Sequence, residues 1–107
     1  MALEHRWSRR KQVKLDAFIF HRLAGLIRAN ILNLGLEGVF IDAGCQTLPP
    51  QSSVELTFAL HGNDLRTIHQ MEALVIHQAH NGYGLMFKDF RHSAFQAIKA
   101  MLYAGQL

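Results

Sequence analysis

The sequence predicts a mainly β fold: a small six-stranded antiparallel barrel with a C-terminal α-helix and an extended N-terminal arm. Apolar and polar residues alternate along most of the chain, turn-forming residues separate these segments at short intervals, and a helical period appears only near the end. The chain has 107 residues, and half of them are apolar. It is therefore long enough for one domain with a buried core. Closing such short strands into a barrel would remove exposed strand edges.

Residues 1–12 are predicted to form a flexible basic arm, and residues 13–107 to form the barrel domain. Within the domain, the strand pattern appears at 13–23, 25–34, 39–42, 54–60, 65–80 and 83–90. Residues 43–53 are expected to form a loop, because Pro49 and Pro50 cannot take part in a central strand. Segment 65–80 would suit a helix by composition, but the Asn81-Gly82 pair that follows favours a hairpin.

The period changes in the last segment, where a helix is expected over about residues 92–104. Phe95, Ile98, Met101 and Leu102 recur at helical spacing. Four alanines in the same segment favour a helix by propensity. We expect one face of this helix to lie against the barrel.

The net charge of +3 is concentrated at the N-terminus. Residues 1–14 contain five Lys or Arg and one Glu, whereas residues 15–107 contain six Lys or Arg and seven Asp or Glu. A protein that binds double-stranded nucleic acid would usually carry its basic face on the folded domain. A local cluster on a near-neutral body is more typical of a site for a small anion, or of a tail that touches a larger polyanion.

Other features exclude several classes of protein. The chain has no apolar run long enough to span a membrane, no signal-peptide pattern and a single cysteine, Cys45, so we expect a cytoplasmic protein. We expect neither a metal nor an enzyme, because no nucleophile motif is present and the histidines form no ligand motif. The seven histidines, which we expect to be structural or at the surface, are His5, His21, His61, His69, His77, His80 and His92.

Two stretches are candidates for binding. In the arm, Arg6 and Arg10 are four residues apart, with Arg9 and the only tryptophan, Trp7, between them. Guanidinium groups bind phosphates and guanine edges through paired donors, and a tryptophan ring offers a stacking surface. The second stretch is NLGLEG, residues 33–38, at a predicted turn between strands. Its asparagine can recognise a base edge, and its glycines can admit a ligand or a positive φ angle.

Together, an RxxxR arm and an NxGxxG turn about twenty residues later resemble the PilZ domain family. The family binds the bacterial second messenger cyclic diguanylate, and its motifs are RxxxR and [D/N]xSxxG. The resemblance covers the arm, the strands and the terminal helix. It implies that Arg6 and Arg10 grip phosphates and guanine edges, that Asn33 contacts guanine, and that Gly35 and Gly38 admit the ligand.

The sequence departs from the family pattern at Gly35, where the family has serine, and at His5, where many members have arginine. Loss of one hydroxyl contact would cost about 0.5–3 kcal/mol, so binding would be weakened rather than abolished. We therefore expect a stand-alone receptor that binds cyclic diguanylate and signals to a separate, unidentified protein. No cofactor is expected, and self-association stays open.

Two alternatives remain. One is a module of the same fold that has lost its nucleotide and only binds a protein, which the glycine at position 35 favours. The other is a small barrel that binds RNA or single-stranded DNA through the basic arm.

Overall fold

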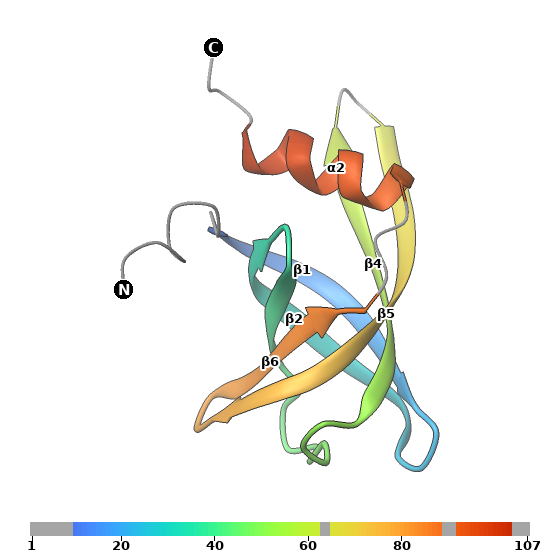
Figure 1. Ribbon diagram of the computed structural model, residues 1–107, viewed down its shortest axis with the longest axis vertical. Coiled ribbons are helices and arrows are strands. Elements are labelled where there is room, and N and C mark those ends of the chain that lie inside the picture. The colour runs from blue at the N-terminus through green and yellow to red at the C-terminus, as the bar shows by residue number, and fades with distance from the viewer. Residues whose placement is uncertain (1–9, 63–64, 89–91, 104–107) are drawn as a thin grey trace.

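The computed structural model describes residues 10–62, 65–88 and 92–103, which form a closed antiparallel barrel with a helix beside one end (Figure 1). The fold class predicted from the sequence is confirmed. The strands and the helix of the described residues are β1 (Arg10–His21), β2 (Gly25–Gly35), β3 (Gly38–Asp42), β4 (Ser53–Gly62), β5 (Leu65–Ala79), β6 (Gly82–Phe87) and α2 (His92–Leu102).

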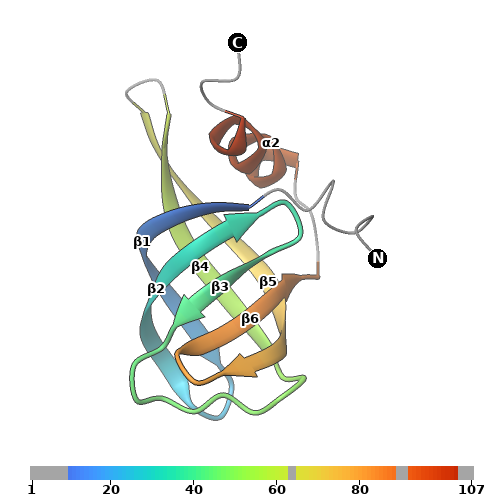
Figure 2. The ribbon, with the colours of Figure 1, turned by 90° about the vertical axis from the view of Figure 1, so that its left-hand side faces the viewer.

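Around the barrel, the strands follow the order β1-β2-β3-β6-β5-β4 (Figure 2). β1 closes the ring by pairing with β4, with Ala17–Phe20 opposite Glu55–Phe58. β3 pairs with β6 rather than with β4, the next strand in sequence. The chain between β3 and β4, residues 43–52, therefore crosses one end of the barrel as the predicted loop.

The first strand begins at Arg10, three residues before its predicted start at Val13. Arg10 is paired with Gly35, and Gln12 is paired with Asn33. The sequence suggested an arm here because these residues are polar, but β1 needs only its main chain to pair with β2 while its side chains stay exposed. Residues 10–12 of the predicted arm are therefore part of the barrel wall, and residues 1–9 lie outside the described residues.

Alternate residues of the strands fill the core, as expected for a closed barrel. The largest side chains with almost no exposure are Ile19, Ile31, Leu34, Val39, Ile41, Leu48, Leu56, Met71, Val75, Leu85 and Ile98. α2 buries Ala94, Ile98 and Leu102, which lie on one face at a spacing of four residues. That face packs against β4 and β2, so the helix adds to the core at the end of the barrel.

The segment that could have been a helix is strand β5, and the hairpin predicted after it is present. The turn is formed by His80 and Asn81, and Gly82 begins β6 opposite Ala79. Gly82 does not have a positive φ angle. Glycine is needed at this position for another reason, because a Cβ atom there would collide with the carbonyl oxygen of Ile41 on β3.

Among the histidines whose side chains the structure describes, two are buried and have structural partners. His21 Nδ1 accepts hydrogen bonds from the main-chain nitrogens of Leu23 and Ala24, at 3.1 and 3.2 Å, and so fixes the turn between β1 and β2. His69 lies next to the Phe58 ring, and its Nε2 is 2.8 Å from the hydroxyl of Thr67. Burial lowers the pKa of His69, because the charged imidazolium loses its hydration.

This lowered pKa predicts a loss of stability in mild acid. Below about pH 6.5 the unfolded chain takes up a proton on His69 that the folded protein resists. The free energy of unfolding should therefore fall as the pH drops below that value, by at most about 1.4 kcal/mol per pH unit for one proton. Urea unfolding at pH 7.5 and 5.5 should show a smaller loss for His69→Gln than for the wild type. The matched control is His61→Gln on the exposed surface. If His69→Gln lost as much stability between pH 7.5 and 5.5 as the wild type, the assignment of this loss to His69 would be wrong.

Candidate functional site

The start of β1 and the turn between β2 and β3 meet on the outer surface of the barrel. Arg10 Nε donates a hydrogen bond of 2.8 Å to Asn33 Oδ1, and Arg10 Nη2 lies 3.5 Å from the carbonyl oxygen of Gly38. The guanidinium group therefore spans both ends of the NLGLEG stretch. Antiparallel pairing of β1 with β2 causes this meeting, because it places Arg10 directly opposite Gly35.

The structure thus brings together four of the residues singled out in the sequence: Arg10, Asn33, Gly35 and Gly38. The other three lie outside the described residues: Arg6, Trp7 and Arg9. β1 continues from Arg10 with its main chain paired to the end of β2. The anchor point of the arm is therefore beside the turn.

The two glycines of the turn do not have the conformation that the sequence suggested. Among the described residues, only Gly25 and Gly44 are glycines with positive φ angles, so Gly35 and Gly38 keep ordinary backbone angles. Gly38 is needed for close approach instead. A Cβ atom there would collide with the carbonyl oxygen of Leu85 and lie 3.1 Å from the Cα of Met86. The absence of a side chain lets β3 and β6 pair tightly beneath the site.

Arg10 supplies the positive charge of this surface. Partial burial lowers its pKa, whereas the nearby carboxylate of Glu37 raises it. An arginine remains protonated under any physiological condition despite such shifts. The main-chain oxygen of Glu37 accepts a hydrogen bond of 2.8 Å from the nitrogen of Phe87, which fixes the turn against the end of β6. A cation and a carboxylate therefore lie side by side at the edge of the same surface.

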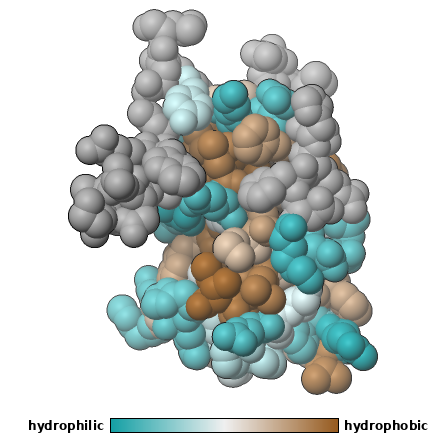
Figure 3. Space-filling model, viewed as in Figure 1, coloured by the Kyte–Doolittle hydropathy of each residue, from teal (hydrophilic) through white to brown (hydrophobic). Residues whose placement is uncertain are grey.

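Two recesses flank Arg10 on the outer face of the barrel, with Ile76 and Leu85 bordering both. The first has a volume of about 400 Å³ and is lined by Arg10, Glu37, Gly38, Ile76, Leu85, Met86 and Phe87. The second has a volume of about 290 Å³ and is lined by Arg10, Asn33, Val39, Phe40, Ile76, His77, Gly84 and Leu85. Figure 3 shows apolar surface, in brown, on the face where β5 and β6 lie in Figure 1. The site therefore combines a guanidinium group and an amide with apolar walls.

Sequence reasoning did not find the walls of these recesses, among them Phe40, Ile76, His77 and Gly84. Phe40 and Gly84 come together through the pairing of β3 with β6. Irregularities in strand pairing place Asn33 and His77 on the same face, because one extra residue reverses the face on which the following side chains lie. Such shifts occur in β2 between Ile31 and Asn33 and in β5 between Val75 and His77. A prediction from the sequence assumes strict alternation, so it does not detect either shift.

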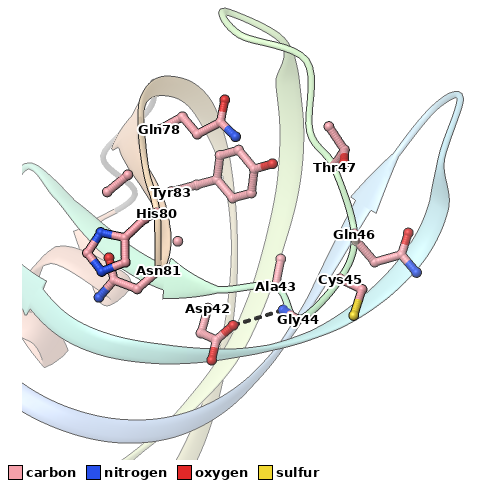
Figure 4. Close-up of a pocket in the computed structure, with 12 residues that line it drawn as sticks. Asp42, Ala43, Gly44, Cys45, Gln46, Thr47, Gln78, His80, Asn81 and Tyr83 are labelled. Atoms are coloured by element: carbon pink, nitrogen blue, oxygen red, sulfur yellow. Dashed lines mark hydrogen bonds between the residues drawn. The ribbon is translucent and has the colours of Figure 1, made fainter.

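A third recess lies at the other end of the barrel, between residues 42–47 and 78–83 (Figure 4). Its volume is about 320 Å³. Asp42 Oδ1 accepts a hydrogen bond of 2.9 Å from Gly44 N, and the Tyr83 hydroxyl accepts one of 3.0 Å from Leu48 N. These side chains hold the loop in place, and the exposed Cys45 has no catalytic partner indicated by the sequence. We therefore regard this recess as structural.

Two other kinds of feature are absent from the described residues. No group of three or more His, Cys, Asp or Glu side chains there could hold a metal ion. None of the helices described is long and apolar enough to cross a membrane.

Comparison with known proteins identifies the fold. The sequence matches no model of a known protein family and none of the curated proteins. Its structure is similar to that of the Bacillus subtilis inhibitor of motility MotI/DgrA, with a TM-score of 0.81 and 18% identity over 94% of this chain. The match covers 51% of the MotI/DgrA chain, so the present chain spans about half of that protein's length.

A second similar structure is the PilZ domain of CeSA from a cellulose-synthesizing bacterium. The TM-score is 0.66 with 10% identity, and the match covers 94% of this chain and all of the other. The chain therefore has the PilZ fold, as the resemblance of its motifs implied.

The close approach at Gly38 predicts that no side chain is tolerated there. Gly38→Ala would force β3 and β6 apart and should lower the free energy of unfolding by at least about 1–3 kcal/mol, the usual cost of overpacking. Gly25→Asn is the contrasting control, because Gly25 has open space and a φ of +82°. Asparagine tolerates such an angle, so this variant should stay within about 1 kcal/mol of the wild type. Urea unfolding of both variants tests this, and a fully stable Gly38→Ala protein would contradict it.

Proposed function

We propose that this chain is a receptor for cyclic diguanylate that passes its signal to a separate protein. One observation carries the proposal: the hydrogen bond between Arg10 and Asn33, which joins the RxxxR stretch to the NxGxxG turn. In the family that these motifs resemble, both groups contact the same ligand. Here they lie together at the border of two recesses on the barrel surface.

The chemistry of the site fits a ligand with phosphates and guanines. A guanidinium group has five N–H donors, and the bonds to Asn33 and Gly38 occupy two of them. The remaining donors can bind a phosphate or the O6 and N7 acceptors of guanine. Asn33 holds the guanidinium group in place through its oxygen and keeps its NH2 group as a donor for a base edge.

In this proposal Arg6 and Arg9 bring further positive charge to the ligand, and Trp7 offers a stacking surface. The motif supports a second phosphate contact from Arg6, which is four residues before Arg10. Ligand would then hold the arm against the barrel and change the surface that another protein contacts. One protein of similar structure is named as an inhibitor of motility, and control of motility is therefore one output to test for this chain.

A module that binds only a protein is the second candidate, and three observations favour it. Gly35 lacks the hydroxyl of the family motif, and Glu37 places a carboxylate beside Arg10. In addition, Phe18, Phe20 and Leu26 expose 46%, 48% and 69% of their surface on β1 and β2. Exposed apolar clusters of this kind mark protein interfaces. A partner captured equally well with and without cyclic diguanylate would favour this candidate.

Isothermal titration with cyclic diguanylate tests the receptor proposal. The wild type should bind at micromolar or lower concentration, and Arg10→Ala should bind about 10- to 100-fold more weakly, because hydrogen bonds to charged groups are lost. The matched control is Arg28→Ala, an exposed arginine on β2 that borders neither recess beside Arg10. Binding only at millimolar concentration, or equal affinity of Arg10→Ala and wild type, would defeat the proposal.

The carboxylate of Glu37 should weaken the binding of any anionic ligand next to Arg10. Glu37→Gln keeps the main-chain bond to Phe87 and removes the negative charge, so the affinity for cyclic diguanylate should rise about 2- to 10-fold at low salt, as expected for charges in partly aqueous surroundings. Screening should reduce this gain as salt is added. Glu55→Gln, on β4, is the control and should leave binding unchanged. Weaker binding by Glu37→Gln would show instead that the carboxylate accepts a bond from the ligand.

A further inference from the structure

One row of residues crosses four strands on the outer face of the barrel next to Arg10. Asn33 on β2 is paired with Phe40 on β3, Phe40 is paired with Gly84 on β6, and Gly84 is paired with His77 on β5. Directly opposed residues of antiparallel strands present their side chains on the same face. An amide, a phenyl ring, a bare glycine and an imidazole therefore follow one another across the surface.

Gly84 differs from the other two glycines of β3 and β6. Gly38 and Gly82 lack a side chain because a Cβ atom would collide with a carbonyl oxygen of the neighbouring strand. At Gly84 a Cβ atom would meet only the side chain of His77, at 3.3 Å from its Cβ and 4.0 Å from two ring carbons. This contact is tight, but it is milder than the collisions at Gly38 and Gly82, because no main-chain atom lies in the way. The effect of Gly84 is to keep the surface open between Phe40 and His77.

The spacing of the strands sets the distance between the backbones of the two wall residues. Neighbouring strands lie about 4.8 Å apart, so the backbones of Phe40 and His77 flank Gly84 at a separation of about 10 Å. A planar ring in van der Waals contact on both sides needs about 7–8 Å. Phe40 leans toward Gly82, since its Cε2 lies 2.9 Å from the position of a Cβ there. This leaves the space above Gly84 accessible.

The recess at this place has a volume of about 290 Å³, near the lower end of the roughly 300–1,000 Å³ typical of ligand pockets. Arg10 and Asn33 line its polar side, and Ile76 and Leu85 add apolar surface. A base lying on Gly84 would thus have a phosphate-binding group and an amide within the same recess.

From this arrangement, we infer that the surface between Phe40 and His77 is a slot for one purine base, with Gly84 as its floor. The inference rests on the proposed function, because it places one guanine of cyclic diguanylate in this slot while Arg10 contacts the adjacent phosphate. Stacking on aromatic side chains does not depend on base identity. The slot therefore supplies affinity, and Asn33 and Arg10 supply the recognition of guanine.

Substitution of Gly84 separates binding from folding. Gly84→Ala and Gly84→Val fill the floor of the slot, and both replace glycine in a strand by a residue with a higher β propensity. For Gly84→Ala we expect a melting temperature close to that of the wild type, because the gain in β propensity offsets the tight contact with His77, together with a loss of at least about tenfold in affinity for cyclic diguanylate. A glycine with a purely structural role would give the opposite result, with lower stability.

The walls of the slot provide independent variants. Phe40→Leu and His77→Ala should each weaken binding about 5- to 100-fold, the range measured for loss of a stacked side chain. The controls are Phe18→Leu and His61→Ala, an exposed phenylalanine and an exposed histidine that border neither recess beside Arg10. They should bind as the wild type does. If the Gly84, Phe40 and His77 variants all bound cyclic diguanylate as tightly as the wild type, the proposal of a base-binding slot would be wrong.

NMR titration of the wild type distinguishes failure of the slot from failure of the proposed function. Cyclic diguanylate should move the α-protons of Gly84 and the ring protons of His77 upfield, because a stacked base shields them. Binding that depends on Arg10 without these shifts would overturn the slot and leave the receptor function intact. If guanosine monophosphate causes these upfield shifts and cyclic diguanylate does not, the slot is supported and cyclic diguanylate is rejected as the ligand. An absence of shifts with both nucleotides, and of binding by titration, would reject both proposals.

Discussion

The pairing of the first residues of β1 with the last residues of β2 is the constraint on which the candidate site depends. It places Arg10 opposite Gly35 and lets the guanidinium group bond to Asn33 and to the carbonyl of Gly38. The same β1 strand closes the barrel through its pairing with β4. Folding of the barrel wall therefore also brings the groups of the candidate site together.

Glycines on β3 and β6 shape this surface for two different reasons. At Gly38 and Gly82, the neighbouring main chain occupies the space of a Cβ atom, so glycine is a condition of strand pairing. At Gly84 only the side chain of His77 lies close to that space, and the residue borders a recess on the outer face. The distinction separates positions that maintain the fold from one that is available for function, although all three residues belong to the same pair of strands.

Charge at the site has two opposing contributions. Arg10 attracts an anion, and the carboxylate of Glu37 beside it reduces that attraction. Gly35 removes a hydroxyl that the family motif provides. A receptor with these features would respond at higher ligand concentration than one with the complete motif. The apolar surface of Phe18, Phe20 and Leu26 on β1 and β2 is separate from this site and suits a protein partner in either candidate function.

The local structure and the polar part of the candidate site could be predicted from the sequence. Alternation and turn residues indicated the six strands, apolar spacing indicated the helix, and the motif residues Arg10, Asn33 and Gly38 were identified before their proximity was known. These features depend on short segments of chain, so the sequence records them directly. The roles of Arg6, Trp7 and Arg9 in ligand binding remain predictions.

Only the tertiary structure decided which strands are neighbours and which side chains share a face. The pairing of β3 with β6 joins segments far apart in sequence, and irregularities in β2 and β5 change the alternation on which a prediction would rest. Phe40, Gly84 and His77 come together only through these two effects. Strand register is a property of the closed barrel as a whole, because each pairing must agree with all the others around the ring.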